Sequence, residues 1–390
     1  MNSVIYNKAI SLLHTASNKN GFLASAEAIS NYKRIWARDG VICGLAALLD
    51  GDEKLISIFK NTLITLANHQ HELGHIPSNV YFKENEETEV SFGGLAGRVD
   101  TISWFIIGVC NYTNTTNDEE FFNKMKTHID KGLKLLNAWE FNNNHLLYVP
   151  RSGNWADEYI TEGHIFYDQV LRLWALRCVC QIENSKHISE KINLVTTILE
   201  ENYTAGTILH PFHPRAYKTL KMEPYWMASI NPSGYQTMFD AFGNSIALLL
   251  KLGDDTFRKN QILYMEELRK SLKLQLLPAF WDPIFPEDQQ WKLLENNCKY
   301  QFRNIPYEFH NGGTWQMVNG FYGMSITKDM PDVAEEIIAG IEMLNSEEDF
   351  GFYENFNTQT GAATGVKFCT WSAAGQIIAT QSNKGKTFLK

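Results

Sequence analysis

The chain has 390 residues, of which 44% are hydrophobic, 13% aromatic and 20% charged. These fractions provide enough apolar side chains for a large buried core and exclude an intrinsically disordered chain or a coiled coil. A formal net charge of −9, without a dense run of lysine and arginine, argues against nucleic acid as a partner.

Apolar residues recur at helical spacing in twelve segments, each of which ends at a cluster of Gly, Pro or Asn. Strand-like alternation is rare outside the gaps between them. The predicted helices cover residues 3–17, 37–50, 53–70, 99–112, 118–139, 163–182, 185–201, 236–252, 255–276, 313–327, 330–344 and 369–384.

Short and long connections alternate along the whole chain. The second, fourth, sixth, eighth and tenth helices are each followed by only a few residues, such as Gly51-Asp52, which is typical of an αα-hairpin. The other gaps hold about 19 to 36 residues and cover 18–36, 71–98, 140–162, 202–235, 277–312 and 345–368. This alternation places all the long loops at one end of the helical array, where a site can form.

Six hairpin units of about 66 residues account for the full length. We therefore predict an all-α fold in which residues 1–390 form one domain, a closed (α/α)6 toroid. The alternative is an open helical solenoid, but solenoids usually show a repeated consensus and this chain shows none.

Nothing near the start of the chain resembles a targeting segment. The residues MNSVIYNKAI lack the charged and apolar regions of a secretory signal, and no apolar run approaches the roughly 18 residues that span a bilayer. We expect a cytoplasmic protein without a membrane partner. Six scattered cysteines, without a C-x-x-C pair, indicate neither a disulfide framework nor a zinc site.

The ends of the long loops carry polar groups together with tryptophan or tyrosine. Examples are Trp36-Ala37-Arg38-Asp39, Asn154-Trp155-Ala156-Asp157 and His310-Asn311-Gly312-Gly313-Thr314-Trp315. Aromatic faces cover the C–H side of a pyranose, and carboxylates and amides bond to its hydroxyls, so the pattern favours a carbohydrate site. A nucleotide site would need Gly-rich phosphate loops and basic residues instead.

Two of these acids are candidates for catalysis. Glu354 stands alone among aromatic residues in Phe350-Gly351-Phe352-Tyr353-Glu354-Asn355-Phe356, and Asp157 ends another loop. One carboxyl group that protonates the leaving oxygen and one that activates water or attacks the anomeric carbon suffice to hydrolyse a glycosidic bond. Asp39 and Asp100 are also compatible with a simple role at a helix N-terminus, and Asp100 is an alternative to Asp157 as the acid.

Four ordered motifs resemble those of (α/α)6-barrel glycoside hydrolases, especially alkaline/neutral invertases, and also glucosidase I-like enzymes, trehalases and debranching-type glucosidases. The resemblance covers roughly residues 30–385. Its motifs are Trp36-Ala37-Arg38-Asp39 (W-x-R-D), Arg98-Val99-Asp100-Thr101-Ile102-Ser103-Trp104 (R-V-x-x-V-D-S-x-L-W), His310-Asn311-Gly312-Gly313-Thr314-Trp315 (H-N-G-G-S-W) and Thr370-Trp371-Ser372-Ala373-Ala374-Gly375 (T-W-T-I-A-G).

The resemblance implies Asp157 as general acid, Glu354 as general base, inversion at the anomeric carbon and no cofactor or metal. The segment from Tyr353 to Gly361 reads like the glucosidase I-type Y-E-N-Y-N-P-x-T-G. The resemblance also implies that Arg38 and Asp39 hold hydroxyls of the released sugar and that Trp315 and Trp371 line the same subsite. With the other aromatic and polar residues of the motifs and loop ends, the candidate substrate-binding residues are Trp36, Arg38, Asp39, Asp100, Trp104, Trp155, His310, Asn311, Trp315 and Trp371.

One departure from the invertase pattern concerns the substrate. Invertases carry M-I-D-R-R-M-G-I-Y-G-H, whereas this chain has Glu158 after Asp157 and lacks the two arginines. The segment Trp155-Ala156-Asp157 looks more like the corresponding segment of debranching-type glucosidases. We therefore expect an exo-acting hydrolase of an α-glucoside, either sucrose or a small α-gluco-oligosaccharide. Loops 79–92, 205–230 and 280–305 are expected to shape the leaving-group side.

Three other functions remain open from the sequence. A sugar epimerase or isomerase on the same barrel would use histidines for proton transfer, with His75, His164 and His310 as candidates. A non-catalytic carbohydrate-binding barrel would bind sugar without turnover. A metal site at His69, His71 and His75 is disfavoured, because positions i and i+2 of a helix point apart.

Overall fold

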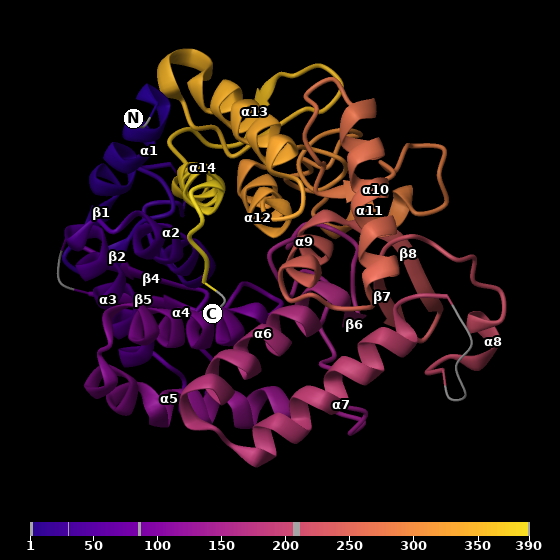
Figure 1. Ribbon diagram of the computed structural model, residues 1–390, viewed down its shortest axis with the longest axis horizontal. Helices are drawn as coiled ribbons and strands as arrows, with labels where there is room; N and C mark the ends of the chain where they lie inside the picture. Colours follow the sequence, from indigo (N-terminus) through magenta and orange to yellow (C-terminus); the bar gives the residue numbers. More distant parts are fainter. Residues whose placement is uncertain (1–2, 30, 85–86, 206–210, 389–390) are drawn as a thin grey trace.

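The computed structural model describes residues 3–29, 31–84, 87–205 and 211–388. Six inner helices form a closed ring, in which each contacts the next and the last contacts the first (Figure 1). They are α2 (Ala37–Asp50), α4 (Asp100–Thr116), α6 (Phe166–Glu183), α9 (Ala241–Leu249), α12 (Gln316–Ile326) and α14 (Thr370–Asn383). Nearly every residue of these helices is buried.

Six further helices surround this ring. They are α1 (Val4–Thr15), α3 (Glu53–Asn68), α5 (Glu119–Ala138), α7 (Lys186–Asn202), α10 (Asp255–Ser271) and α13 (Pro331–Phe350). The sixth inner–outer pair joins the two ends of the chain, because α1 packs against α14. All twelve predicted helices are present, and the closed ring confirms the (α/α)6 toroid over the open solenoid.

The short turns follow a common local rule. Gly51, Asn117 and Asn184 end inner helices in the left-handed conformation, with φ of 96°, 56° and 50°. The next residue then caps the outer helix: Asp52, Asp118 and Ser185 each accept a hydrogen bond from the backbone N–H three residues on. A left-handed residue followed by a capping side chain reverses the chain within two residues.

The long loops contain short strands that the helical periodicity does not predict. They are β1 (Ser17–Asn18), β2 (Gly21–Phe22), β3 (Ile35–Trp36), β4 (Asn79–Phe82), β5 (Thr88–Ser91), β6 (His164–Ile165), β7 (Met227–Asn231), β8 (Gly234–Asp240), β9 (Phe280–Trp281), β10 (Asn355–Phe356) and β11 (Ala363–Thr364). Antiparallel sheets in the orders β3-β4-β5 and β6-β7-β8-β9 connect the loops of successive hairpins.

Two helix boundaries differ from those expected for reasons that the structure shows, and two short helices were not expected. The predicted helix 236–252 begins only at Ala241, because residues 234–240 pair with β7 and Asp240 caps the helix through the N–H groups of Phe242 and Gly243. The predicted helix 330–344 extends to Phe350 with a kink at residues 347–349. Two short helices, α8 (Pro214–Tyr217) and α11 (Trp291–Asn297), lie within long loops.

The first N–H groups of the inner helices are bonded by neighbouring long loops. In five of the six inner helices the residue before the helix makes no capping side-chain hydrogen bond. At four of these five helices, backbone bonds from the next long loop replace the cap: Ala37 N to Ser78 O at 3.0 Å, Val99 N to Gly153 O at 2.7 Å, Thr314 N to Phe356 O at 2.8 Å and Thr370 N to Ala24 O at 2.9 Å.

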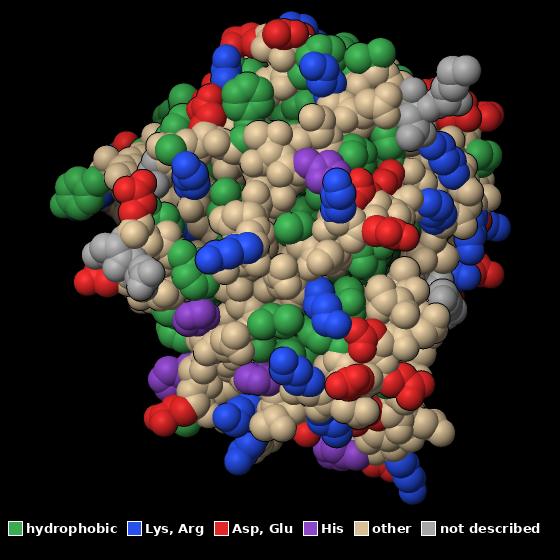
Figure 2. Space-filling model, turned by 90° about the vertical axis from the view of Figure 1, so that its left-hand side faces the viewer, with side chains coloured by type: hydrophobic (Ala, Val, Ile, Leu, Met, Phe, Trp, Pro, Cys, Tyr) green, Lys and Arg blue, Asp and Glu red, His purple; other side chains and the backbone are tan. Residues whose placement is uncertain are grey.

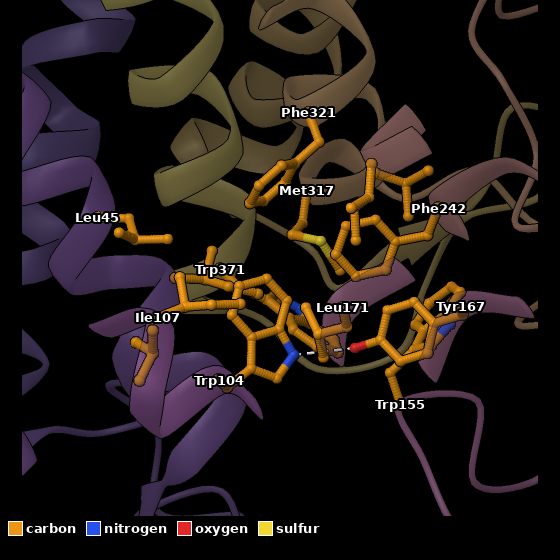
Figure 3. Close-up of a cluster of buried hydrophobic side chains, with 14 of the residues drawn as sticks. Leu45, Trp104, Ile107, Trp155, Tyr167, Leu171, Phe242, Met317, Phe321 and Trp371 are labelled. Carbon is orange, nitrogen blue, oxygen red and sulfur yellow. Dashed lines mark hydrogen bonds between the residues drawn. The ribbon is translucent and has the colours of Figure 1, made fainter. Parts of the chain in front are cut away.

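Large aromatic side chains fill the centre of the ring (Figure 3). Trp104 stacks on Phe242 and meets Trp174 and Phe321 edge-on, with ring centroids 5.9–6.2 Å apart. Near the C-terminus, Phe388 stacks on Trp174 at 6.0 Å. Each such aromatic pair contributes about 0.5–1.5 kcal/mol beyond the burial of its area, so the ring encloses a packed core.

The described part of the chain can be compared with the expectations about membrane spans, basic surface charge and cysteines. None of its helices combines the length and apolar character needed to cross a bilayer. On the face shown in Figure 2, lysine and arginine are interspersed with aspartate and glutamate and form no continuous stripe. All six cysteines have free thiols.

The crossing of α12 and α14 allows a test of the ring. A Cβ added at Gly320 would lie 2.6 Å from the Gly375 Cα, whereas one at Gly323 would meet only side chains at 3.5 Å or more. We expect Gly320→Ala to lower the free energy of unfolding by about 1–3 kcal/mol, because the backbones must separate. Gly323→Ala, the control on the same helix, should be neutral or stabilise by up to about 1 kcal/mol. Urea unfolding measures both, and equal effects would contradict the close crossing.

Candidate active site

A cavity of about 670 Å³ opens at the end of the ring where the inner helices begin. Its walls come from the loops before α2, α6, α12 and α14 and from the first turns of α2 and α14. Nine of the twelve expected site residues line it: Trp36, Arg38, Asp39, Trp155, Asp157, His310, Trp315, Glu354 and Trp371. The position of a long loop before each inner helix thus brings together residues that are far apart in sequence.

Glu354 is buried in the cavity wall. Its Oε1 accepts a hydrogen bond from the Tyr32 hydroxyl at 2.7 Å, and its Oε2 has no partner within the described residues. Burial raises the pKa of Glu354 to about 7, against the opposing effects of the Tyr32 hydrogen bond and the charge of Arg303. One oxygen is therefore held in place by a hydroxyl, and the other is buried without a hydrogen-bond partner among the described residues.

Asp157 is more accessible than Glu354, with 28% of its side chain exposed. Arg98 donates from Nη2 to Asp157 Oδ2 at 2.7 Å and from Nη1 to the Ala96 carbonyl oxygen at 2.9 Å. Arg98 also bonds to the Ser152 carbonyl. This arginine therefore joins the loop that carries Asp157 to the loop before α4.

Asn154 fixes the same loop from the other side. Its Oδ1 accepts from the Ala156 N–H at 3.0 Å, and its Nδ2 donates to Asp168 Oδ2 at 2.8 Å. Since Asp168 lies in the first turn of α6, the peptide just before Asp157 is attached to a rigid helix.

Arg38 and Asp39 form the buried floor at the start of α2. The Arg38 Nε lies 4.0 Å from Asp39 Oδ2, and its guanidinium lies 5.3 Å from the Trp371 ring centroid. Burial raises the pKa of Asp39 to about 6, although the charge of Arg38 opposes this. These groups can hold the hydroxyls of a sugar that reaches the closed end.

Three expected site residues lie outside the cavity wall. Asp100 is one layer deeper, where Arg38 Nη1 donates to its Oδ2 at 3.4 Å and the Tyr167 hydroxyl donates to the same oxygen at 3.2 Å. Trp104 donates to the Tyr167 oxygen at 2.9 Å, as the dashed line in Figure 3 marks. Both residues therefore support Arg38 from below.

Asn311 is the third of these residues. Its Nδ2 donates to the carbonyl of Ile284 at 2.9 Å, and its Oδ1 accepts from the Ile284 N–H at 2.7 Å. These backbone partners occupy the amide and show that Asn311 shapes the turn between His310 and Trp315.

Aromatic rings surround His310. It stacks on Trp315 at 5.2 Å and meets Trp155 edge-on at the same distance. Neither ring nitrogen has a hydrogen-bond partner among the described residues. Burial lowers the pKa of His310 to about 3, so the ring is neutral and carries one donor and one acceptor nitrogen, both buried in the cavity wall.

The chain matches the family described as alkaline and neutral invertase over residues 4–205 and 218–384. It belongs to that family. Among its relatives, the mitochondrial alkaline/neutral invertase C of Arabidopsis thaliana is 24% identical over 410 residues, which cover 90% of this chain and 61% of that protein. Cytosolic invertase 1 of Oryza sativa subsp. japonica is 22% identical over 422 residues, covering 91% and 72%. The expected membership of a glycosidase family is confirmed.

Solved structures show the same fold at low identity. The mannosylglycerate hydrolase of Thermus thermophilus has a TM-score of 0.72 at 12% identity and covers 96% of this chain and 100% of its own. The glucoamylase of Saccharomycopsis fibuligera has a TM-score of 0.63 at 13% identity and covers 97% and 94%. These likenesses confirm the predicted (α/α)6 glycosidase fold of this member of the invertase family.

The cavity of this invertase-family protein also contains residues that the sequence motifs do not mark. Tyr32 contacts Glu354, and Arg303 pairs with Glu158 and lies over the Phe309 ring at 4.1 Å. Of the three loops expected to shape the leaving-group side, only 280–305 contributes described lining residues. Residues 85–86 and 206–210 of the other two lie outside the described chain. The abundance of Tyr and Arg in loops gives no signal that would single out Tyr32 or Arg303.

The histidines considered for a metal are each bonded separately. His69 Nδ1 lies 2.8 Å from the Thr65 carbonyl oxygen, and His75 Nε2 lies 2.8 Å from that of Arg98. Within the residues that the structure describes, no group of three or more His, Cys, Asp and Glu could hold a metal ion. The environment of these rings is aromatic, with Phe82, Phe92 and Trp139 as neighbours.

We expect the His310 side chain to stay uncharged between pH 5 and pH 9. Its pKa of about 3 predicts no titration of the ring between pH 5 and pH 9. The measurement is the ¹³C–¹H spectrum of histidine-labelled protein, with His310→Gln used to assign the signal. A midpoint between pH 5.5 and 7.5 would contradict the desolvated environment and would revive a histidine-based proton transfer.

Proposed function

We propose that the protein hydrolyses α-glucosides from their ends with inversion at the anomeric carbon. The observation that carries this proposal is the opening of two carboxyl groups, Asp157 and Glu354, from two different loops into one cavity. Membership of the alkaline and neutral invertase family supports it. The substrate we propose is sucrose or a small α-gluco-oligosaccharide.

The shape and lining of the cavity support a sugar substrate. Its volume of about 670 Å³ falls within the range of small-molecule sites. Trp315 and Trp371 meet edge-on at 5.4 Å and are both almost fully buried at the closed end. A pyranose can rest its C–H face on such rings. A closed inner end favours recognition of a terminal sugar over cleavage inside a chain.

In the proposed reaction, the two carboxyl groups act on opposite sides of the sugar. Asp157 donates a proton to the glycosidic oxygen while the bond from this oxygen to the anomeric carbon breaks. Glu354 removes a proton from a water molecule whose oxygen forms the new bond to the same carbon. Tyr32 remains protonated, because burial raises its pKa, and orients the Glu354 carboxylate through its hydrogen bond.

The position of the acids favours Asp157 over Asp100 as the proton donor. Asp157 lines the cavity and is partly exposed, whereas Asp100 is covered by Arg38 and Tyr167. Arg38, Asp39 and His310 are the proposed partners of the sugar hydroxyls. The proposed location is cytoplasmic, although the names of the relatives include both a mitochondrial and a cytosolic protein.

The product anomer tests the reaction directly. The protein is incubated with sucrose, trehalose, maltose, isomaltose and kojibiose, and the released sugar is followed by proton NMR. Inversion predicts that β-glucose appears first from an α-glucoside. Initial release of α-glucose would refute the inverting mechanism, and binding without turnover would favour a non-catalytic barrel.

The carboxyl variants complete this test. We expect Asp157→Asn and Glu354→Gln each to reduce kcat by at least about 10²–10⁴-fold. Their double replacement should be little worse than either single change if the two groups act as a unit. Asp130→Asn is the control, because Asp130 lies on outer helix α5 with its carboxylate beside Lys126. Loss of turnover in His310→Ala with retention in Glu354→Gln would support the epimerase alternative.

The hydrogen bond from Tyr32 should set the acid limb of the pH profile. A general base must be ionised, so kcat/KM should rise as the pH increases through the Glu354 pKa of about 7. Tyr32→Phe removes a donor that lowers this pKa, and we expect the limb to move to higher pH. Profiles from pH 5 to 9 measure the shift, with Tyr148→Phe outside the cavity as control. A uniform loss at every pH would indicate that Tyr32 acts in another way.

A further inference from the structure

The outer wall of the cavity is a segment that connects α11 to the His310 turn. Tyr300, Gln301, Phe302 and Arg303 of this segment line the cavity. Two asparagines fasten it to the loop that carries Asp157. Asn297 Nδ2 donates to the Tyr159 carbonyl at 3.1 Å, and Asn304 Nδ2 donates to the Glu158 carbonyl at 3.0 Å.

The strongest contact between this segment and the acid loop is an ion pair. Arg303 Nε donates to Glu158 Oε2 at 3.2 Å, and its Nη2 donates to Oε1. Both carboxylate oxygens are thus engaged by one guanidinium, a geometry that fixes the orientation of both side chains. The Phe309 ring lies 4.1 Å from the guanidinium carbon and supports it from one side.

The ion pair lies on the open side of the cavity. The Arg303 side chain is 43% exposed, while Trp315 and His310 at the closed end are 1% exposed. Glu158 directly follows Asp157, the group that protonates the leaving oxygen in the proposed function. A leaving group that departs towards solvent therefore passes beside Glu158 and Arg303.

We infer that Glu158 determines the leaving group, because it occupies the Arg303 guanidinium and thereby selects uncharged leaving groups over those that carry a carboxylate. This inference rests on the proposed hydrolysis and concerns its leaving-group specificity. Without Glu158, the Arg303 fork would be free to bind a substrate carboxylate in the same two-point manner.

The charges around the cavity explain the selection. Among the described lining residues, four are acidic, Asp39, Asp157, Glu158 and Glu354, and two are basic, Arg38 and Arg303. An added carboxylate meets like charges and has no vacant guanidinium, and such an unpaired charge is costly to desolvate. A hydroxyl-bearing leaving group can bond to either member of the pair without separating it.

The experiment compares two substrates that differ in one group, 2-O-α-D-glucosylglycerol and 2-O-α-D-glucosyl-D-glycerate. For the wild-type protein we expect kcat/KM to be at least about tenfold higher for the neutral compound. Glu158→Gln should reduce this ratio by about tenfold or more, mainly through KM for the glycerate. Glu158→Asp, which keeps the charge, should retain the neutral preference.

Glu162→Gln is the matched control. It removes the same charge from the same loop, but Glu162 pairs with Arg151 at 2.9 Å and does not line the cavity. An unchanged ratio in this variant excludes a general effect of net charge. A ratio that stays constant in a folded Glu158→Gln protein, as judged by thermal unfolding, would overturn the inference.

A binding measurement separates this inference from the proposed hydrolysis. Calorimetry with the two compounds uses the Asp157→Asn protein, alone and combined with Glu158→Gln, so that no turnover is required. If the wild-type protein hydrolyses neither compound, but Glu158→Gln shifts the relative affinity of the Asp157→Asn protein towards the glycerate, the proposed function is refuted and the role of Glu158 as the selector is supported. Equal affinities in both proteins, or no binding of either compound, would overturn the role of Glu158.

Discussion

The end of the ring that carries the candidate active site depends on one constraint: the first backbone N–H groups of the inner helices need hydrogen-bond acceptors. Five of these helices begin without a capping side chain, although buried donors must be bonded. The next long loop around the ring supplies the acceptors, such as Gly153 O for Val99 N and Ala24 O for Thr370 N. At four of these five helices, α2, α4, α12 and α14, the next long loop therefore bonds a backbone N–H at or just before the start of the helix.

This arrangement also explains where the buried acids lie. Asp39, Asp100 and Asp168 occupy the first turns of α2, α4 and α6, where free N–H groups and the helix dipole favour negative charge. Burial still raises the pKa of each of them, so desolvation outweighs the favourable helix ends. Arg38 contacts both Asp39 and Asp100 and offsets part of that cost. The floor of the cavity is consequently polar and rigid.

The sequence predicted the helices well because their limits have local causes. A left-handed Gly51 or Asn184 and a capping Asp52 or Ser185 mark the turns whatever the rest of the chain does. The predicted start of α9 was wrong because residues 234–240 form strand β8 and pair with β7, a contact that the local sequence pattern does not predict. In the site, Asn311 is next to His310 in sequence, yet only tertiary contacts decide that one amide faces Ile284 and the neighbouring ring faces the cavity.

Arg303 connects the two sides of the proposed chemistry. It binds Glu158, the residue after the proposed acid, and its charge also lowers the pKa of Glu354, the proposed base. Its position depends on Asn304, whose Nδ2 bonds to the acid loop while its Oδ1 accepts the backbone N–H groups of His310 and Asn311. A substitution that removes or displaces the Arg303 charge is therefore expected to raise the pKa of Glu354. Under the two proposals, specificity and rate are therefore coupled, because a single guanidinium contributes to both.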